Sequence, residues 1–131
     1  MCAIDDAERC DVWNEGDKKA RKPHVCSECR REIAKGETYR RIDALYDGHW
    51  TTSRQCQHCR VGADWLSEEC GGYLMDGVCE EIHEHAQEYR SLALWRLVAG
   101  ADRKWKRARG GLMPVPRMPP LTPDSTRKRA A

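Results

Sequence analysis

The sequence predicts a small α+β protein whose fold is organised by a bound metal ion. Three observations predict this class: two Cys-x-x-Cys pairs, a β-hairpin pattern between them, and helical patterns after them. The chain has 131 residues, no Phe and a mean hydropathy of −0.83. A chain of this size and polarity buries only one small core, so part of its stability has to come from the metal.

The two pairs are Cys26-Ser27-Glu28-Cys29 and Cys56-Gln57-His58-Cys59. A two-residue spacer lets both sulfurs of a pair face one ion at about 2.3 Å, and four thiolates make the closed tetrahedral shell of structural zinc. A redox dithiol and plain buried thiols are the alternatives. A thioredoxin-type dithiol needs one pair in a βαβ unit, whereas two pairs here flank a hairpin pattern. We therefore expect the four cysteines to bind Zn²⁺.

A β-hairpin is expected between the pairs. Residues 38–46 and 49–55 are rich in β-branched and aromatic side chains, and Asp47-Gly48 joins them. Asp-Gly between two such runs predicts a two-residue turn, because both central positions of a type I′ turn have φ > 0. A two-residue loop fixes the register, so Leu45 and Trp50 are expected to be paired on one face of the hairpin.

A short helix is expected directly after the second Cys pair. Residues 60–69 lack Pro, carry Ala63, Trp65 and Leu66, and are followed by Gly71-Gly72, a typical helix stop. The first turn of this helix supplies two ligands. A knuckle closed by Gly36, a hairpin and a ligand-bearing helix, over residues 24–70, resemble the treble-clef zinc finger. That resemblance implies a fold and leaves the function open.

A long second helix is predicted over residues 78–109, packed on the zinc module. This stretch has no Pro, and apolar residues recur along it at helical spacing, namely Ile82, Ala86, Tyr89, Ala93 and Leu97. Gly100 is a point of bending or interruption. The Pro-rich, basic tail over residues 110–131 is predicted to be disordered. The remaining parts of the chain are an acidic N-terminal segment, residues 1–20, and the four-cysteine zinc module, residues 21–77.

Four further cysteines raise the question of a second metal site. Cys70, Cys79 and His83 are candidate ligands, with His85, His24 or Cys10 as a fourth. The alternative is that Cys70 and Cys79 are small core residues between two helices, since free Cys is among the most buried residue types. Their C-x8-C-x3-H spacing matches no standard zinc finger, which favours the core interpretation. Cys2 and Cys10 are expected to be unliganded.

Charge is strongly segregated along the chain. The net charge is +2, but residues 1–20, 21–60, 61–89 and 90–131 carry −3, +4, −8 and +9. These blocks either pair within the monomer or present separate faces to partners. No stretch reaches the length of a membrane span, and the acidic N-terminus is unlike a secretion signal. Eight cysteines then favour metal binding in the reducing cytoplasm.

The residue inventory argues against three classes of zinc enzyme, and we expect no enzymatic activity. Nucleases of the HNH type use a hairpin His and an Asn, whereas Asn14 is the single Asn and precedes the module. Zinc deaminases need His-x-Glu upstream of Pro-Cys-x-x-Cys, which is absent here. His83-Glu84-His85 differs from the His-Glu-x-x-His of metalloproteases. His58, between two ligands, is expected to face solvent.

Residues 19–95 resemble a group of small uncharacterised proteins of phages and prophages. The resemblance is carried by ARKPHVCSEC at 20–29, IAKGETY at 33–39, DGHW at 47–50, CQHC at 56–59, DWL at 64–66 and EHA at 84–86. It implies a phage origin, a bacterial host cell as the location, and zinc binding. It implies no established activity.

Two functions are compatible with these observations. The first is nucleic-acid binding by arginines around the zinc module, with Arg41 opposite Arg54 in the predicted hairpin and a basic C-terminus adding attraction. The candidate residues are Arg30, Arg31, Arg40, Arg41, Arg54 and Arg60. Their alternative partners are Glu28, Glu32 and Glu37. The second function is a protein-binding adaptor or inhibitor that presents the acidic residues 61–89 to a host or phage protein. No small-molecule substrate is expected.

Overall fold

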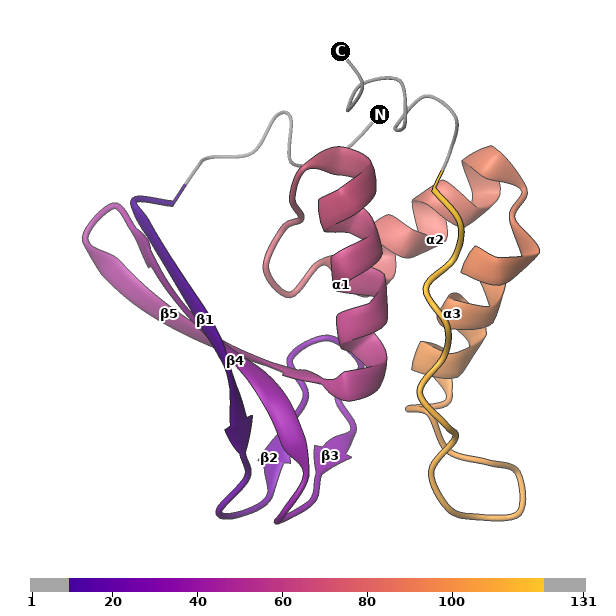
Figure 1. The fold of residues 1–131 in the computed structure, drawn as a ribbon, viewed down its shortest axis with the longest axis horizontal. Coiled ribbons are helices and arrows are strands. Elements are labelled where there is room, and N and C mark those ends of the chain that lie inside the picture. Colours follow the sequence, from indigo (N-terminus) through magenta and orange to yellow (C-terminus); the bar gives the residue numbers. More distant parts are fainter. Residues whose placement is uncertain (1–9, 122–131) are drawn as a thin grey trace.

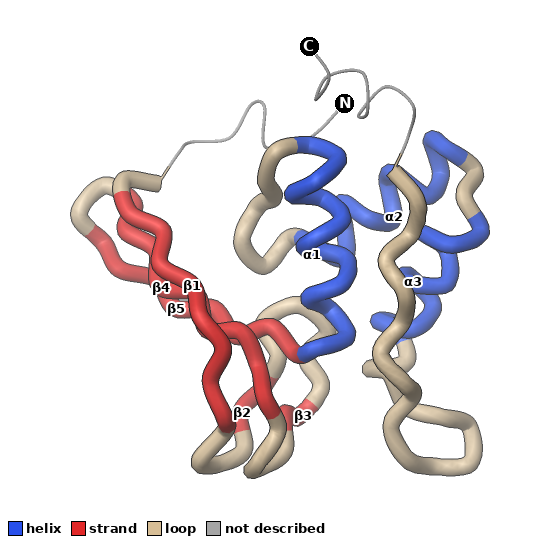
Figure 2. The backbone as a smooth tube through the Cα atoms, viewed as in Figure 1, coloured by secondary structure: helices blue, strands red, loops and turns tan. Residues whose placement is uncertain are grey.

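The structure, a computed structural model, describes residues 10–121 of the chain. These residues form a three-stranded sheet, a two-stranded ribbon and three helices (Figure 1). The strands are β1 (Val12–Lys19), β2 (His24–Val25), β3 (Glu32–Ile33), β4 (Thr38–Tyr46) and β5 (His49–Cys56), and the helices are α1 (Gln57–Cys70), α2 (Val78–Tyr89) and α3 (Leu92–Asp102). The three helices lie on one side of the sheet, and no helix of residues 10–121 covers its other face (Figure 2).

The predicted hairpin is confirmed residue for residue. β4 and β5 pair in antiparallel register from Tyr46 opposite His49, and Leu45 lies opposite Trp50. Asp47 and Gly48 have φ values of +47° and +80°, as a type I′ turn requires. The register was predictable because a two-residue loop leaves one way to align the strands.

β1 is an element that the sequence pattern did not predict, since residues 1–20 were expected to be an acidic segment. Val12–Lys19 pairs along the whole of β4, so the sheet order is β1-β4-β5. Its last six residues are exposed and polar, which explains why no strand signal was visible. Pairing with the open edge of β4 overrides this weak local preference. The first part of the acidic segment, residues 1–9, lies outside the described residues.

The ribbon and the first helix follow the predicted order of knuckle, hairpin and helix. β2 and β3 form a two-stranded antiparallel ribbon around the first Cys pair. α1 begins directly after Cys56 and ends at Gly71, which has a left-handed φ of +81° and donates its N–H to Ser67 O. This glycine stop confirms the predicted end of the helix.

The single long helix predicted over residues 78–109 is wrong, because the chain forms two helices that pack against each other. α2 ends at Arg90, which adopts a left-handed conformation with φ +50°, and Ser91 then caps α3 by accepting the N–H of Leu94 at 3.2 Å. Ser91 was a local signal for this break. Gly100 lies within α3 and does not interrupt it.

Trp105 closes the helical layer after α3. The chain leaves α3 through Lys104 and Trp105, both with positive φ, and the indole of Trp105 is 3% exposed. A Cβ placed on Gly100 would lie 2.1 Å from the Trp105 ring, so the absence of a side chain at Gly100 lets the indole reach the interior. This contact gives Gly100 a packing role in place of the predicted bend.

Disorder was predicted for residues 110–131, and this is wrong for residues 110–121. The segment returns as an extended chain along α1 (Figure 1). Met113 N donates to Trp105 O at 2.7 Å, Trp65 Nε1 donates to Pro120 O at 3.1 Å, and Leu121 packs against the core. Prolines favour an extended chain, and tertiary contacts hold it in place here. Residues 122–131 lie outside the described residues.

The core lies between the inner face of the sheet and the helices. Ile42 and Ala44 from β4, Leu66 from α1 and Leu94 from α3 are at most 1% exposed. The core continues to the buried cysteines at one end of the sheet. Within residues 10–121, none of the helices has the length and apolar character needed to cross a membrane.

We expect Gly100→Ala to destabilise the protein. The added methyl group would overlap the Trp105 ring, and overpacking of this kind costs about 1–3 kcal/mol of unfolding free energy. Chemical denaturation checks this, with Gly16→Ala as the control because a Cβ at Gly16 meets no atom within 4 Å. Equal stability of the two variants would contradict the packing of Trp105 on Gly100.

Candidate metal centre

The four predicted ligands come together in the structure. The sulfurs of Cys26, Cys29, Cys56 and Cys59 all lie within 4.8 Å of one another, and all four residues are buried. Cys29 Sγ and Cys56 Sγ are 3.9 Å apart. Four sulfurs at about 2.3 Å from one ion in a tetrahedron are about 3.8 Å apart, so this separation suits a metal of the size of Zn²⁺. The group can therefore hold a metal ion, and four thiolates favour zinc.

Hydrogen bonds in the loop between β2 and β3 and at the start of α1 orient the four sulfurs toward one another. In the loop between β2 and β3, Cys26 N donates to Arg31 O at 2.9 Å and Arg30 N donates to Cys26 O at 3.0 Å. Arg30 takes a left-handed φ of +69°, which turns the chain back toward the ribbon. At the start of α1, Cys56 is the N-cap and its sulfur accepts the N–H of Cys59. The loop and the helix start thus each supply one pair.

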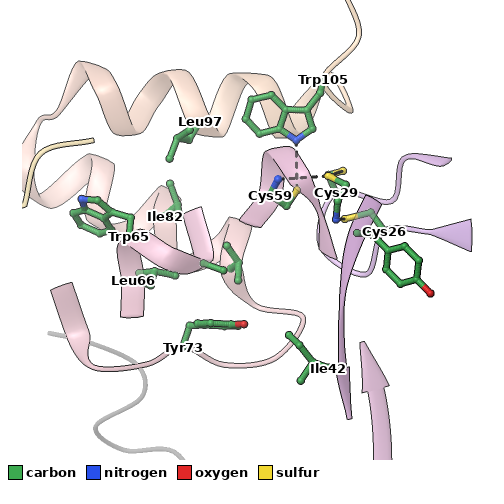
Figure 3. Close-up of a cluster of buried hydrophobic side chains, with 14 of the residues drawn as sticks. Cys26, Cys29, Ile42, Cys59, Trp65, Leu66, Tyr73, Ile82, Leu97 and Trp105 are labelled. Atoms are coloured by element: carbon green, nitrogen blue, oxygen red, sulfur yellow. Dashed lines mark hydrogen bonds between the residues drawn. The ribbon is translucent and has the colours of Figure 1, made fainter. Parts of the chain in front are cut away.

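A hydrogen-bond donor, Trp105, and a cationic side chain, Arg31, lie near the sulfurs and offset their charge. Trp105 Nε1 donates to Cys59 Sγ at 3.4 Å, a buried hydrogen bond seen in Figure 3. Arg31 is 4% exposed and binds both oxygens of Glu37 at 2.9 and 3.1 Å. Burial alone would lower the pKa of Arg31, but Glu37 and the nearby Cys56 sulfur raise it above its ordinary value. Four thiolates around one Zn²⁺ keep a net negative charge, which these donors stabilise.

The sulfurs also share protons among themselves. Hydrogen bonding with Cys29 lowers the pKa of Cys26 to about 7, and the same contact raises the pKa of Cys29. Contact with Cys26 likewise lowers the pKa of Cys56 and raises that of Cys59. A metal that binds all four as thiolates has to displace the retained protons, so we expect binding to release protons and to weaken as pH falls.

His58 is buried, and the prediction that it faces solvent is wrong. Its side chain is 2% exposed, its ring lies 5.2 Å from the Trp105 ring, and Nε2 is within hydrogen-bonding distance of Met113 O. The physical reason is the C-terminal segment, which covers the first turn of α1. His58 therefore connects the second Cys pair to residues 110–121.

Glu28 connects the first Cys pair to the helices. Its carboxylate accepts the N–H of Val78, at the start of α2, at 3.2 Å, and the Gln55 amide lies 3.5 Å away. Burial raises the pKa of Glu28 to about 7, opposed by the hydrogen bond from Val78. Glu28 was expected as a partner for the arginines, and it binds a helix N-terminus instead.

The candidates for a second metal site lie apart from one another. Cys70 is disulfide-bonded, and its sulfur is 3.5 Å from His85 Nε2. Cys79 lines a small pocket together with Cys59 and Trp105. His83 is exposed and contacts the Trp95 ring. Within residues 10–121, Cys70, Cys79 and His83 do not form a metal-binding group. Cys10 is a free, half-buried thiol, and Cys2 lies outside the described residues.

The six candidate arginines divide into two groups. Arg31, Arg40 and Arg60 are engaged with carboxylates: Arg31 with Glu37, Arg40 with Asp64 at 2.8 Å, and Arg60 with Asp17 at 2.6 Å. Arg41 lies opposite Arg54 in the hairpin, as predicted, and Arg30 is exposed in the loop between β2 and β3. Arg41 Nε contacts Asp43 at 3.2 Å, whereas Arg30 and Arg54 form no ion pair within residues 10–121.

The acidic residues 61–89 do not form one continuous face. Glu69 and Glu81 are 7% and 3% exposed, Asp64 binds Arg40, and Asp76 accepts a hydrogen bond from Ser53. Glu80 and Glu84 are exposed on α2, one helical turn apart. Asp64, Glu69, Asp76 and Glu81 are therefore buried or bonded inside the molecule, and of these Asp64 pairs with basic side chains, as the intramolecular interpretation of the charge pattern proposed.

No protein-family model, curated protein or solved structure matches this chain. The resemblances to treble-clef fingers and to phage proteins therefore stay predictions. The sequence also did not reveal Trp105 as a neighbour of the metal site, because it lies 46 residues from Cys59 in the chain. The basic segment around Trp105 carried no local signal for such a contact.

We expect Cys29→Ala to abolish metal binding and cooperative folding, because it removes one of four ligands and metal-binding energy in such modules is folding energy. Cys79→Ala is the matched control, since Cys79 lies beside the cluster and outside the ligand set. The control should retain one zinc per chain. Metal analysis and thermal unfolding of both variants check this. A cooperative transition that survives complete metal removal would contradict the structural role of zinc.

Trp105→Phe should lower zinc affinity while the stoichiometry stays at one. The Phe ring keeps most of the packing but removes the N–H that binds Cys59 Sγ. Loss of such an outer partner typically costs about 10- to 100-fold in metal affinity. Competition with a chelator measures the effect. Trp65→Phe, which removes an N–H bonded to Pro120 O, is the control and should leave zinc affinity unchanged.

Proposed function

We propose that this chain is a zinc-stabilised, non-enzymatic protein that binds nucleic acid through the outer face of its sheet. The outer face is defined as the side chains of β1, β4 and β5 that point away from the helices. The observation that carries the proposal is the cross-strand pair Arg41 and Arg54 on this face. Two cations held opposite each other create a site for an anion.

The outer face is open along most of its length. Side chains alternate along a strand, and four of the inward side chains of β4 and β5, namely Ile42, Ala44, Ser53 and Gln55, are fully buried. The outward set of Arg41, Asp43, Thr52 and Arg54 is half-buried or exposed. No helix covers this side of the sheet within the described residues (Figure 2).

Positive charge is incompletely balanced at this pair. Asp43 offsets Arg41, but Arg54 has no ion pair within residues 10–121, and its Nε is buried without a hydrogen-bond acceptor. Burial and then the charges of Arg54, Lys22 and Arg41 lower the pKa of the neighbouring His24. The positive charge of Arg54, which has no ion pair within residues 10–121, favours the binding of a phosphate.

The metal site and the proposed binding face are directly connected. Ser27, between Cys26 and Cys29, donates its N–H to Arg54 O at 2.7 Å, and its hydroxyl accepts the N–H of Arg54 at 3.0 Å. The loop between β2 and β3, which carries Cys26 and Cys29, therefore binds the backbone of Arg54 at the edge of β5 that is not paired with β4. Zinc would act as a structural element that positions this arginine and would take no part in any reaction.

The alternative function, a protein-binding adaptor or inhibitor, has weaker support. Its acidic surface is reduced by the carboxylates that are buried or bonded inside the fold. A phage origin, with the host cytoplasm as the location, is the prediction that the family resemblance supplies. Either function is compatible with such an origin, so the origin does not choose between them.

The salt dependence of binding tests the proposal. Each neutralised phosphate adds to the slope of log affinity against log salt, so Arg41→Gln with Arg54→Gln should reduce that slope by roughly 1.4 to 1.8 units. Fluorescence anisotropy with labelled DNA and RNA measures it. Arg60→Gln is the control, because Arg60 binds Asp17 on the inner side of the sheet. The control slope should equal that of the unaltered protein.

Absence of binding to single- and double-stranded DNA and RNA at low salt would overturn the proposal. It would favour the adaptor function, in which charge reversal at Glu80 and Glu84 should abolish capture of a host protein. Zinc content and thermal unfolding of each variant show whether a loss of binding reflects a loss of fold.

A further inference from the structure

An apolar row crosses the outer face next to the charged pair. In the register of the sheet, Val12 lies opposite Leu45, and Leu45 lies opposite Trp50. We call these three residues the apolar row. Trp50 is 59% exposed, a large fraction for the largest apolar side chain. Together with the half-buried Val12 and Leu45, it forms a contiguous apolar patch, and contiguous patches are the kind of surface that ligands contact.

We propose that the ligand of the outer face is single-stranded nucleic acid, with a base stacked on Trp50 and the backbone bound by Arg41 and Arg54. This inference rests on the proposed function and specifies the class of its ligand. Aromatic side chains stack on bases of any sequence, and basic side chains beside them follow the phosphates. The outer face presents both groups on the same strand, β5.

The spacing of the two groups fits a strand that runs along β5. Trp50 and Arg54 are four residues apart and point to the same side, which separates them by about 13 Å. Between them, the Thr52 hydroxyl donates to Asp43 at 2.7 Å, so the carboxylate is already engaged there. This distance accommodates a few unstacked nucleotides between a base on Trp50 and a phosphate at Arg54.

β1, the third strand of the sheet, leaves room for the backbone of the ligand. Gly16 of β1 lies opposite Arg41, and a Cβ built on Gly16 would meet no atom within 4 Å. The surface above this point of β1 is therefore low and open. Glycine within a strand often marks a place where another backbone approaches closely.

A duplex is a poorer match to this face. Its base faces are covered by their neighbours in the stack, so Trp50 would meet the charged backbone and gain no stacking. The apolar row would then be brought against phosphates, which leaves it without a favourable contact. A single strand exposes the flat faces of its bases and can use the apolar row and the arginines together.

The test compares a labelled mixed-sequence DNA strand with its duplex of the same length, by anisotropy at low salt. Trp50→Ala should weaken single-strand binding roughly 5- to 150-fold and leave duplex binding unchanged. Trp50→Tyr should retain most of the affinity, since Tyr also stacks. Trp95→Ala is the control, because Trp95 is 37% exposed on α3, away from the sheet. Zinc content and thermal unfolding should be the same in all three variants.

Each other outcome overturns the inference in a distinguishable way. Equal binding of strand and duplex, sensitive to Arg54 and insensitive to Trp50, would keep nucleic-acid binding and reject the single-strand assignment. A protein that dissociates from dimer to monomer on Trp50→Ala would assign the apolar row to contact between two copies of the chain. Failure to bind any nucleic acid would reject the proposed function itself.

Discussion

The cluster of four cysteines is the interaction on which the rest of the fold depends. It joins the loop between β2 and β3 to the junction of β5 and the first turn of α1. The ribbon consists of two residue pairs and would be too short to persist alone. Because α1 begins directly after Cys56, its apolar side is fixed over the sheet, and α2, α3 and residues 110–121 pack around it. The four-cysteine group thus lies where the ribbon, the sheet and the first helix meet, and a metal ion held there would fix their relative geometry.

The parts of the structure with local signals were predictable from the sequence. The Asp47-Gly48 turn, the two Cys-x-x-Cys pairs and the glycine stop at Gly71 each involve neighbouring residues and standard backbone angles. β1 was missed because its exposed polar residues become a strand only through β4. The break at Arg90 was missed because an arginine replaces the usual glycine, although Ser91 supplied a cap. The order of residues 110–121 depends on Trp65 and His58, distant residues of another element.

The six candidate arginines also show that contacts between distant residues could not be predicted from the sequence. In the sequence, the six candidates look alike, but three of them are bound to carboxylates that lie 6, 24 and 43 residues away. The nearest of these carboxylates, Glu37, was foreseen as a partner, whereas Asp64 and Asp17 are placed by the packing of α1 and β1. Such pairing is decided by tertiary structure. The sequence identified each of the four cysteines that come together. For the basic surface, it identified six candidate arginines and could not show which of them are engaged with carboxylates.

The two edges of the sheet have different protection against association with other molecules. Ser27 occupies the edge of β5 at Arg54, whereas within residues 10–121 no strand pairs with the outer edge of β1. An open edge can extend its sheet with a strand from another copy, the first step of aggregation. β1 carries Glu15, Asp17, Lys18 and Lys19 along this edge, together with Gly16. Those charges disfavour pairing of β1 with a strand of another molecule. The polar composition that kept β1 from being predicted as a strand therefore also protects its edge against association.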